Sequence, residues 1–209
     1  MGKKFYLLAT FAFFLLSGFA LAWDGQRKGF IMGLGTGINV HSYTSKEESP
    51  EIETRKYDRV NDLGLQLNFK IGYAPTDRLQ FHLTSKTSFS GKTTGITGLG
   101  ADYYLKPNPP SFYFTGVVGI SWWGETLLAQ YIIYRSDGFR GIGLSGGIGY
   151  EFMRNLSAEL SLNWGNPSDF VGVPLDLGLK SSPLPDDYIT AKRTYNVLSA
   201  GLTINALGY

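Results

Sequence analysis

Bulky apolar residues alternate with small or polar residues along most of the chain after Lys28. A period of two is the pattern of a β-strand, because successive side chains of a strand point to opposite faces. The segment LGLQLNFKIGY, residues 63–73, shows the alternation most clearly. No apolar run after residue 22 is long enough for a membrane helix. The alternation therefore predicts an all-β fold.

Eight segments carry this alternation, and turn or loop residues separate them. The predicted strands are 30–41, 63–73, 79–86, 98–105, 112–123, 141–152, 156–164 and 193–209. The predicted connections are long at 44–58, 124–138 and 165–192, and short at 74–78, 106–111 and 153–155. Connection 90–93 is short where the pattern requires a long one. Long loops at one end and short turns at the other are typical of a transmembrane barrel.

Glycine is frequent in the polar phase of the strands, for example at Gly33, Gly35 and Gly37 and again at Gly147 and Gly149. Glycine suits a crowded, narrow interior better than a solvated surface. The bulky phase would then face lipid, and every backbone group must be paired by closing the sheet. We therefore predict an all-β, eight-stranded, antiparallel up-and-down transmembrane β-barrel. The alternative is a soluble, lipocalin-like cup with its apolar residues inside.

Aromatic residues gather near both ends of the predicted strands, as expected for two girdles at the membrane interfaces. The girdle near the short turns would comprise Tyr73, Phe81, Tyr103, Phe112, Tyr150 and Phe152. The girdle near the long loops would comprise Tyr43, Phe89, Trp122, Trp123, Phe139 and Trp164.

The first 22 residues have the organisation of an export signal. Lys3 and Lys4 precede an apolar stretch that ends in Ala20-Leu21-Ala22, a small-x-small cleavage pattern. We expect cleavage after Ala22 and an exported domain of residues 23–209. An uncleaved anchor helix is the alternative.

The exported domain carries no net charge, because the signal holds two of the 19 Lys and Arg residues against 17 Asp and Glu. This balance gives no reason to expect a nucleic-acid partner. The chain has no Cys, so disulfides, a thiolate metal site and a lipid-modified N-terminal cysteine are excluded. No cofactor and no metal site is expected.

Three segments make the chain resemble the OmpA-like small outer-membrane barrels: GLGADYYL at 98–105, GIGLSGGIGYEF at 141–152 and LSAELSLNWG at 156–165. The resemblance implies an outer-membrane location, with lipid and lipopolysaccharide as surroundings. The chain departs from the family in that we expect no peptidoglycan-binding domain after the barrel, so a cell-wall tether is not implied. The resemblance also implies that the terminal Tyr209 is the aromatic signal read by the barrel-assembly machinery. Leu207 and Tyr209 lie out of phase with Leu202 and Ile204, so a bulge near Asn205 is expected.

Six ionisable residues fall on the inward phase of the predicted strands. They are Lys70, His82, Lys86, Asp102, Glu151 and Glu159. Charges inside a narrow barrel must be paired, since their desolvation costs several kcal/mol. We expect a salt-bridged plug, with a proton or ion path as the alternative. Two lysines for three carboxylates would leave a negative excess, which favours a protonated His82 or a protonated glutamate.

A catalytic site has weaker support in the sequence. His41 lies near the long-loop end with Ser42 beside it, and Ser168 and Asp169 lie in the last predicted loop. A histidine can act as general base for a serine when a third group orients it. These four residues are the candidates for an outer-membrane lipid-modifying hydrolase or acyltransferase, although no spacing among them is diagnostic.

The sequence favours a non-enzymatic outer-membrane barrel with a structural or surface-interaction role and a plugged interior. Loops 44–58, 124–138 and 165–192 would face outward and could bind an extracellular ligand, with an apolar contact surface in the last two. The lipid-modifying enzyme and a narrow passive pore are the alternative functions.

Overall fold

The computed structural model describes residues 27–49, 52–90, 92–124, 139–174 and 188–209. The expected signal segment 1–22 and most of the predicted loop 124–138 lie outside these ranges. The described residues form nine strands: β1 Gly29–Ser49, β2 Ile52–Thr76, β3 Leu79–Phe89, β4 Thr93–Tyr104, β5 Ser111–Gly124, β6 Phe139–Met153, β7 Leu156–Gly165, β8 Ser168–Pro174 and β9 Tyr188–Gly208. No helix among the described residues is long and apolar enough to cross a bilayer.

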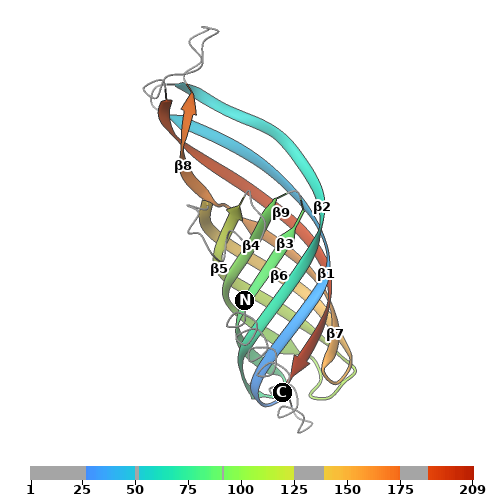
Figure 1. Cartoon of the computed structure of the whole chain (residues 1–209). Coiled ribbons are helices and arrows are strands. Elements are labelled where there is room, and N and C mark those ends of the chain that lie inside the picture. The colour runs from blue at the N-terminus through green and yellow to red at the C-terminus, as the bar shows by residue number, and fades with distance from the viewer. Residues whose placement is uncertain (1–26, 50–51, 91, 125–138, 175–187) are drawn as a thin grey trace, which may run out of the picture.

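All described strand pairs are antiparallel, and most connect neighbours along the chain. The order is β1-β2-β3-β4-β5-β6-β7-β9, and β9 returns to pair with β1 from Met32↔Gly208 to Glu48↔Lys192. The described strands thus close a ring of eight (Figure 1). β8 continues the line of β7 after Asn166 and Pro167, because both pair with β9 in one unbroken register. The predicted up-and-down barrel is confirmed.

The two faces of the ring have opposite chemistry. Leu65 is 63% exposed on the outer face, whereas the neighbouring Gln66 is 1% exposed inside the ring. The same alternation places Leu144 and Leu160 outside and Ser145 and Glu159 inside. An apolar outer face around a polar interior is the inverse of a soluble barrel and the arrangement of a transmembrane one.

A sheet rises from one side of the ring, where the sequence predicted loops at 44–58 and 165–192. Residues 44–49 and 52–60 extend the β1–β2 hairpin, and β8 pairs with residues 188–194 of β9. We call these residues the projecting sheet, which stands well beyond the ends of β3 and β4 (Figure 1). For the described residues of 44–58 and 165–192, the loop predictions were wrong. Charged side chains interrupt the alternation there, although these segments form paired strands outside the apolar layer.

The last strand differs from the expectation of a bulge near Asn205. β9 pairs with both β1 and β7 without a register shift. Leu207 and Tyr209 simply stay on the inward phase, where they pack with Ile31 and Ala74. The change in hydrophobic phase therefore reflects a small apolar cluster on inward positions at the short-turn end of the barrel. Because no bulge turns Tyr209 outward, its interpretation as an assembly signal is weakened.

Candidate functional site

The interior of the barrel, here called the lumen, is the region where buried functional groups gather. Its base lies at the short-turn end, around Arg27. The Arg27 guanidinium lies 4.2 Å from the centre of the Tyr104 ring and donates to Glu151, with Nε at 2.9 Å from Oε2. Tyr209 donates to Glu151 Oε1 at 3.4 Å. The sequence reasoning missed Arg27, because it precedes the first predicted strand.

Above the base lies a network of paired charges. Lys70 Nζ contacts Asp102 at 3.0 Å and Glu159 at 3.1 Å, and Lys86 Nζ contacts Glu159 at 2.8 Å. His82 Nε2 lies 3.1 Å from the other oxygen of Asp102. All five side chains are almost fully buried. The structure thus brings together five of the six predicted interior residues, and places the sixth, Glu151, at the base.

The charges of this network balance, contrary to the expected negative excess. Arg27 supplies a third cation, so that Arg27, Lys70 and Lys86 face Asp102, Glu151 and Glu159 in pairs. The expected excess arose because only inward strand positions were counted. Among the described residues, no group of three or more His, Asp or Glu side chains is arranged to hold a metal ion.

A chain of side-chain amides continues from the charge network toward the projecting sheet. Asn39 donates to Gln66 at 2.9 Å, Gln66 to Asn68 at 2.8 Å, and Asn68 to Thr203 at 3.2 Å. These groups are all buried. The register of β1, β2 and β9 places them at successive inward positions. The chain of bonds gives each amide a defined orientation.

An aromatic cluster covers the lumen beneath the projecting sheet. The Trp123 ring stacks on Tyr195 with centroids 4.6 Å apart, and Tyr43 meets Trp123 edge-on at 4.5 Å. Trp123 is fully buried, and Val197 completes the cluster. Trp123 and Tyr43 were expected in the outer girdle, and that prediction was wrong. Both lie on the inward phase, where they form this aromatic cap.

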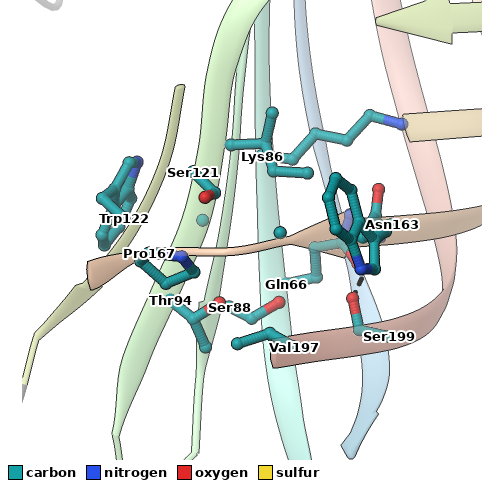
Figure 2. Close-up of a pocket in the computed structure, with 14 residues that line it drawn as sticks. Gln66, Lys86, Ser88, Thr94, Ser121, Trp122, Asn163, Pro167, Val197 and Ser199 are labelled. Carbon is teal, nitrogen blue, oxygen red and sulfur yellow. Dashed lines mark hydrogen bonds between the residues drawn. The ribbon is translucent and has the colours of Figure 1, made fainter. Parts of the chain in front are cut away.

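A small pocket of about 20 Å³ lies in the lumen below the aromatic cap. Gln66, Ser88, Ser121 and Asn163 contribute to its wall, and Asn163 donates to Ser199 at 3.2 Å (Figure 2). A volume of this size holds about one water molecule. At this height the lumen therefore leaves room for little more than a single water molecule.

The four catalytic candidates are not brought together. His41 is inward and 1% exposed, whereas Ser42 belongs to the outward phase. Ser168 and Asp169 lie in β8 of the projecting sheet, in register with Thr194 and Arg193. The hydrogen-bond partners of His41 are Asn39 and Ser90, which sequence reasoning did not pair with it. Ser90 follows β3, which is separated from β1 by β2. Only the register of these three strands shows that Ser90 and His41 lie at the same height.

No protein-family model and no curated protein matches the sequence. Solved structures give several likenesses. The neisserial surface protein A is 15% identical with a TM-score of 0.41, over 85% of this chain and 96% of that chain. The attachment invasion locus protein Ail of Yersinia pestis is 11% identical with a TM-score of 0.36, over 84% and 99%. The outer membrane protein AlkL in lipid bilayers is 11% identical with a TM-score of 0.48, over 88% and 92%.

The fold itself is defined by the strand pairings and by the chemistry of the two faces. The described strands close an eight-membered antiparallel ring whose outer surface is apolar and whose lumen is polar and charged. This is the architecture of the OmpA-like small outer-membrane barrels.

Proposed function

We propose that the protein is a surface-interaction protein of the outer membrane, in which a closed barrel anchors the projecting sheet outside the cell. The observation that carries the proposal is the projecting sheet itself. Four strands stay paired for several residues beyond the ends of β3 and β4. Such an ordered platform exceeds what membrane anchoring requires, since short loops would close the same barrel.

The projecting sheet is pinned by polar contacts that suit an aqueous setting. Arg193 on β9 donates to Glu47 on β1 with Nε 2.6 Å from Oε1, and Tyr57 on β2 donates to Glu47 at 2.8 Å. The hydrogen bond to Glu47 raises the pKa of Tyr57. Three strands are therefore tied together at one buried carboxylate, which supports a defined rather than a fluctuating surface.

The sheet offers a charged edge for an extracellular ligand. β3 pairs with β2 only from Leu65 onward, so residues 54–62 of β2 leave one edge without a described neighbouring strand. Most of these residues are exposed, among them Arg55, Lys56 and Asp58. An unpaired strand edge with exposed charges favours a specific partner over self-association. Lipid and lipopolysaccharide would surround the barrel wall below it.

A plugged lumen, with a role in anchoring rather than transport, is part of this proposal. Paired charges, the amide chain and the aromatic cap succeed one another along the described lumen. An eight-stranded ring leaves an interior just wide enough for side chains. The short turns would lie in the periplasm, and the expected signal peptide would direct export.

Cysteine labelling in intact cells tests the orientation. Asp58→Cys in the projecting sheet should react with a membrane-impermeant maleimide, whereas Arg154→Cys in the β6–β7 turn should react only after the outer membrane is permeabilised. The chain has no native cysteine, so each signal is unambiguous. Equal protection of both positions, or the reverse pattern, would contradict the proposal.

Shortening the projecting sheet tests the role. A variant with residues 45–57 replaced by a two-residue turn should still fold and insert, because the barrel below keeps its pairings. Binding of whole cells to arrays of host glycans and matrix proteins should fall to the level of cells that lack the protein. Undiminished binding by the shortened variant would place the interaction elsewhere.

A further inference from the structure

His41, Ser90 and Asn39 form a linear hydrogen-bonded group at the mouth of the lumen. His41 Nε2 lies 2.5 Å from Ser90 Oγ, and His41 Nδ1 lies 2.9 Å from Asn39 Oδ1. His41 and Asn39 are both 1% exposed, whereas Ser90 is half-buried at the end of β3. A serine on one imidazole nitrogen and an orienting oxygen on the other is the relation found in serine hydrolases.

The amide chain sets the state of the imidazole. Asn39 gives its N–H to Gln66, so its Oδ1 is left to accept a hydrogen bond from His41 Nδ1. Neutral His41 then carries its proton on Nδ1 and presents a lone pair on Nε2 to the Ser90 hydroxyl. The carbonyl of Lys92 lies 3.3 Å from Ser90 Oγ and is the longer of the two contacts. With Nε2 of His41 unprotonated, the Ser90 hydroxyl can donate either to His41 Nε2 or to the Lys92 carbonyl.

The backbone makes room for this arrangement. Gly201 of β9 lies opposite Asn39, and a Cβ there would stand 2.1 Å from Gln66 Oε1 and 3.2 Å from Asn39 Nδ2. Any larger residue would displace the amides that orient His41. The glycine is thus a steric requirement of the hydrogen-bond chain.

Ser90, half-buried just beyond the end of β3, is the most exposed member of the group. β3 ends at Phe89 and β4 begins at Thr93, whereas the neighbouring β1–β2 hairpin extends much further (Figure 1). Ser90 therefore lies where the rim of the ring is low. The same wall carries Ser88 and Gln66 of the small pocket below (Figure 2). A substrate would therefore approach Ser90 from the aqueous mouth.

We propose that Ser90, His41 and Asn39 form a hydrolytic triad that cleaves carboxylic esters at the outer mouth of the barrel. Ser90 Oγ attacks the carbonyl carbon while its proton passes to His41 Nε2. The ester C–O bond then breaks, and the alcohol leaves with that proton, which gives an acyl-Ser90. Water attacks the acyl group through His41 and releases the acid and free Ser90. Asn39 is a positioning residue that holds the His41 tautomer.

Covalent labelling of the full-length protein, refolded in lipid vesicles, tests the nucleophile. A fluorophosphonate forms a phosphorus–oxygen bond to an activated serine as fluoride and the serine proton leave. We expect one adduct by intact mass, placed on Ser90 by peptide mapping. Ser90→Ala should remove it, and His41→Gln should slow labelling on the order of 100-fold or more.

A matched control lies next to the base in the sequence. Ser42→Ala removes a serine hydroxyl from the outer face and should leave labelling unchanged. Asn39→Ala should slow labelling on the order of tenfold or more, and shift its pH profile because the tautomer is no longer held. Each variant is first checked for folding by the heat-dependent shift of its mobility in detergent gels.

The hydrolysis of p-nitrophenyl butyrate gives the second readout. The natural sequence and the Ser42→Ala variant should release nitrophenol equally, and folded Ser90→Ala should release it at the rate of empty vesicles. Absence of a Ser90 adduct in folded protein, or activity that survives Ser90→Ala, overturns the proposal. Neither result affects the proposed role of the projecting sheet, which the Asp58 labelling tests separately.

Discussion

Lys70 is held by two carboxylates at once, Asp102 at 3.0 Å and Glu159 at 3.1 Å, in a fully buried setting. Replacing it by methionine removes the cation that both carboxylates share, and leaves Asp102 with His82 and Glu159 with Lys86 alone. We expect Lys70→Met to lower the free energy of unfolding by about 3–5 kcal/mol. Urea unfolding in lipid vesicles measures this change.

The control is Lys46→Met in the projecting sheet. Lys46 is paired with Glu48, but both side chains are nearly half exposed. Exposed pairs contribute about 0–1 kcal/mol, so this variant should unfold almost like the natural sequence. Equal and negligible effects at positions 70 and 46 would mean that water reaches Lys70.

Gly149 is a residue whose small size the lumen requires. A Cβ built on it would stand 2.0 Å from the Tyr113 ring, whose hydroxyl is held by Glu159 and Ser157. Because the ring is pinned, Gly149→Ala should destabilise the barrel by about 1–3 kcal/mol.

Gly116 provides the matched control, because a Cβ there meets nothing within 4 Å on the outer face. Gly116→Ala should leave the urea midpoint unchanged or slightly raised. If both alanine variants unfolded alike, the crowding of the lumen around Gly149 would be refuted.

The chemistry of single residues was predictable where it followed the strand period, and not where it depended on register. Lys70 and Asp102 were predicted as inward charges, and the structure joins them directly. Ser90 could not be linked to His41, because the pairing of β1 with β2 and of β2 with β3 decides which residues share a height. Arg27 was missed because it reaches the lumen from outside any strand.

At the scale of the element, the strands inside the apolar layer were predictable, since lipid imposes a bulky residue at every second position. The projecting sheet lies beyond that layer, and its strands carry charges on both faces. β1 therefore extends to Ser49 and β9 begins at Tyr188, well outside the predicted bounds. Among the described side chains of the projecting sheet, Glu47 still follows the alternation, because it is buried and accepts a hydrogen bond from Arg193.

Glu47→Gln should loosen the projecting sheet alone. The variant loses the charged partner of Arg193 and the strong acceptor for Tyr57, and hydrogen bonds to charged groups contribute about 1.5–3 kcal/mol. Backbone amides of residues 192–195 should exchange with deuterium roughly tenfold faster or more, while those of residues 200–205 should be unchanged.

Glu48→Gln is the control, because that side chain is exposed, and its pKa is lowered first by the hydrogen bond from Lys46 and then by the charges of Lys46 and Lys192. Its exchange rates should match those of the natural sequence. A uniform acceleration through β9 in the Glu47 variant would show that the sheet and the barrel unfold as one unit.

The whole molecule is a stack of chemically distinct layers inside one ring: an arginine and tyrosine base, a charge network, an amide chain and an aromatic cap. The sequence predicts a plugged lumen. The order of the four layers depends on the shear of the strands, so it could not be predicted. A filled lumen should pass little current. We expect no stable channels when the purified barrel is inserted in planar bilayers at moderate voltage.

Long-lived openings of uniform conductance would contradict this layered interior. Trp123→Ala provides an informative comparison, because it removes the central ring of the aromatic cap but leaves the charge network in place. The variant should remain electrically silent if the charges alone close the lumen.

Arg27 joins three parts of the chain that lie far apart in the sequence. Its backbone N–H donates to Asp77 Oδ1 at 3.1 Å, and its guanidinium donates to the carbonyl of Lys106 at 2.6 Å and to Glu151. These three partners belong to three different hairpins, so we expect the full set of contacts to form late in folding, when the hairpins have assembled. Interactions absent from the transition state for folding act on the rate of unfolding rather than the rate of folding.

The base of the lumen is therefore a kinetic latch. Arg27→Ala should speed the unfolding of the inserted barrel and leave its rate of insertion unchanged, as stopped-flow tryptophan fluorescence in vesicles can measure. Lys28→Ala is the neighbouring control, because Lys28 is exposed. A slower insertion of the Arg27 variant would mean that the latch forms early. The time for which the barrel stays folded in the membrane would then depend strongly on the contacts of Arg27 at the short-turn end.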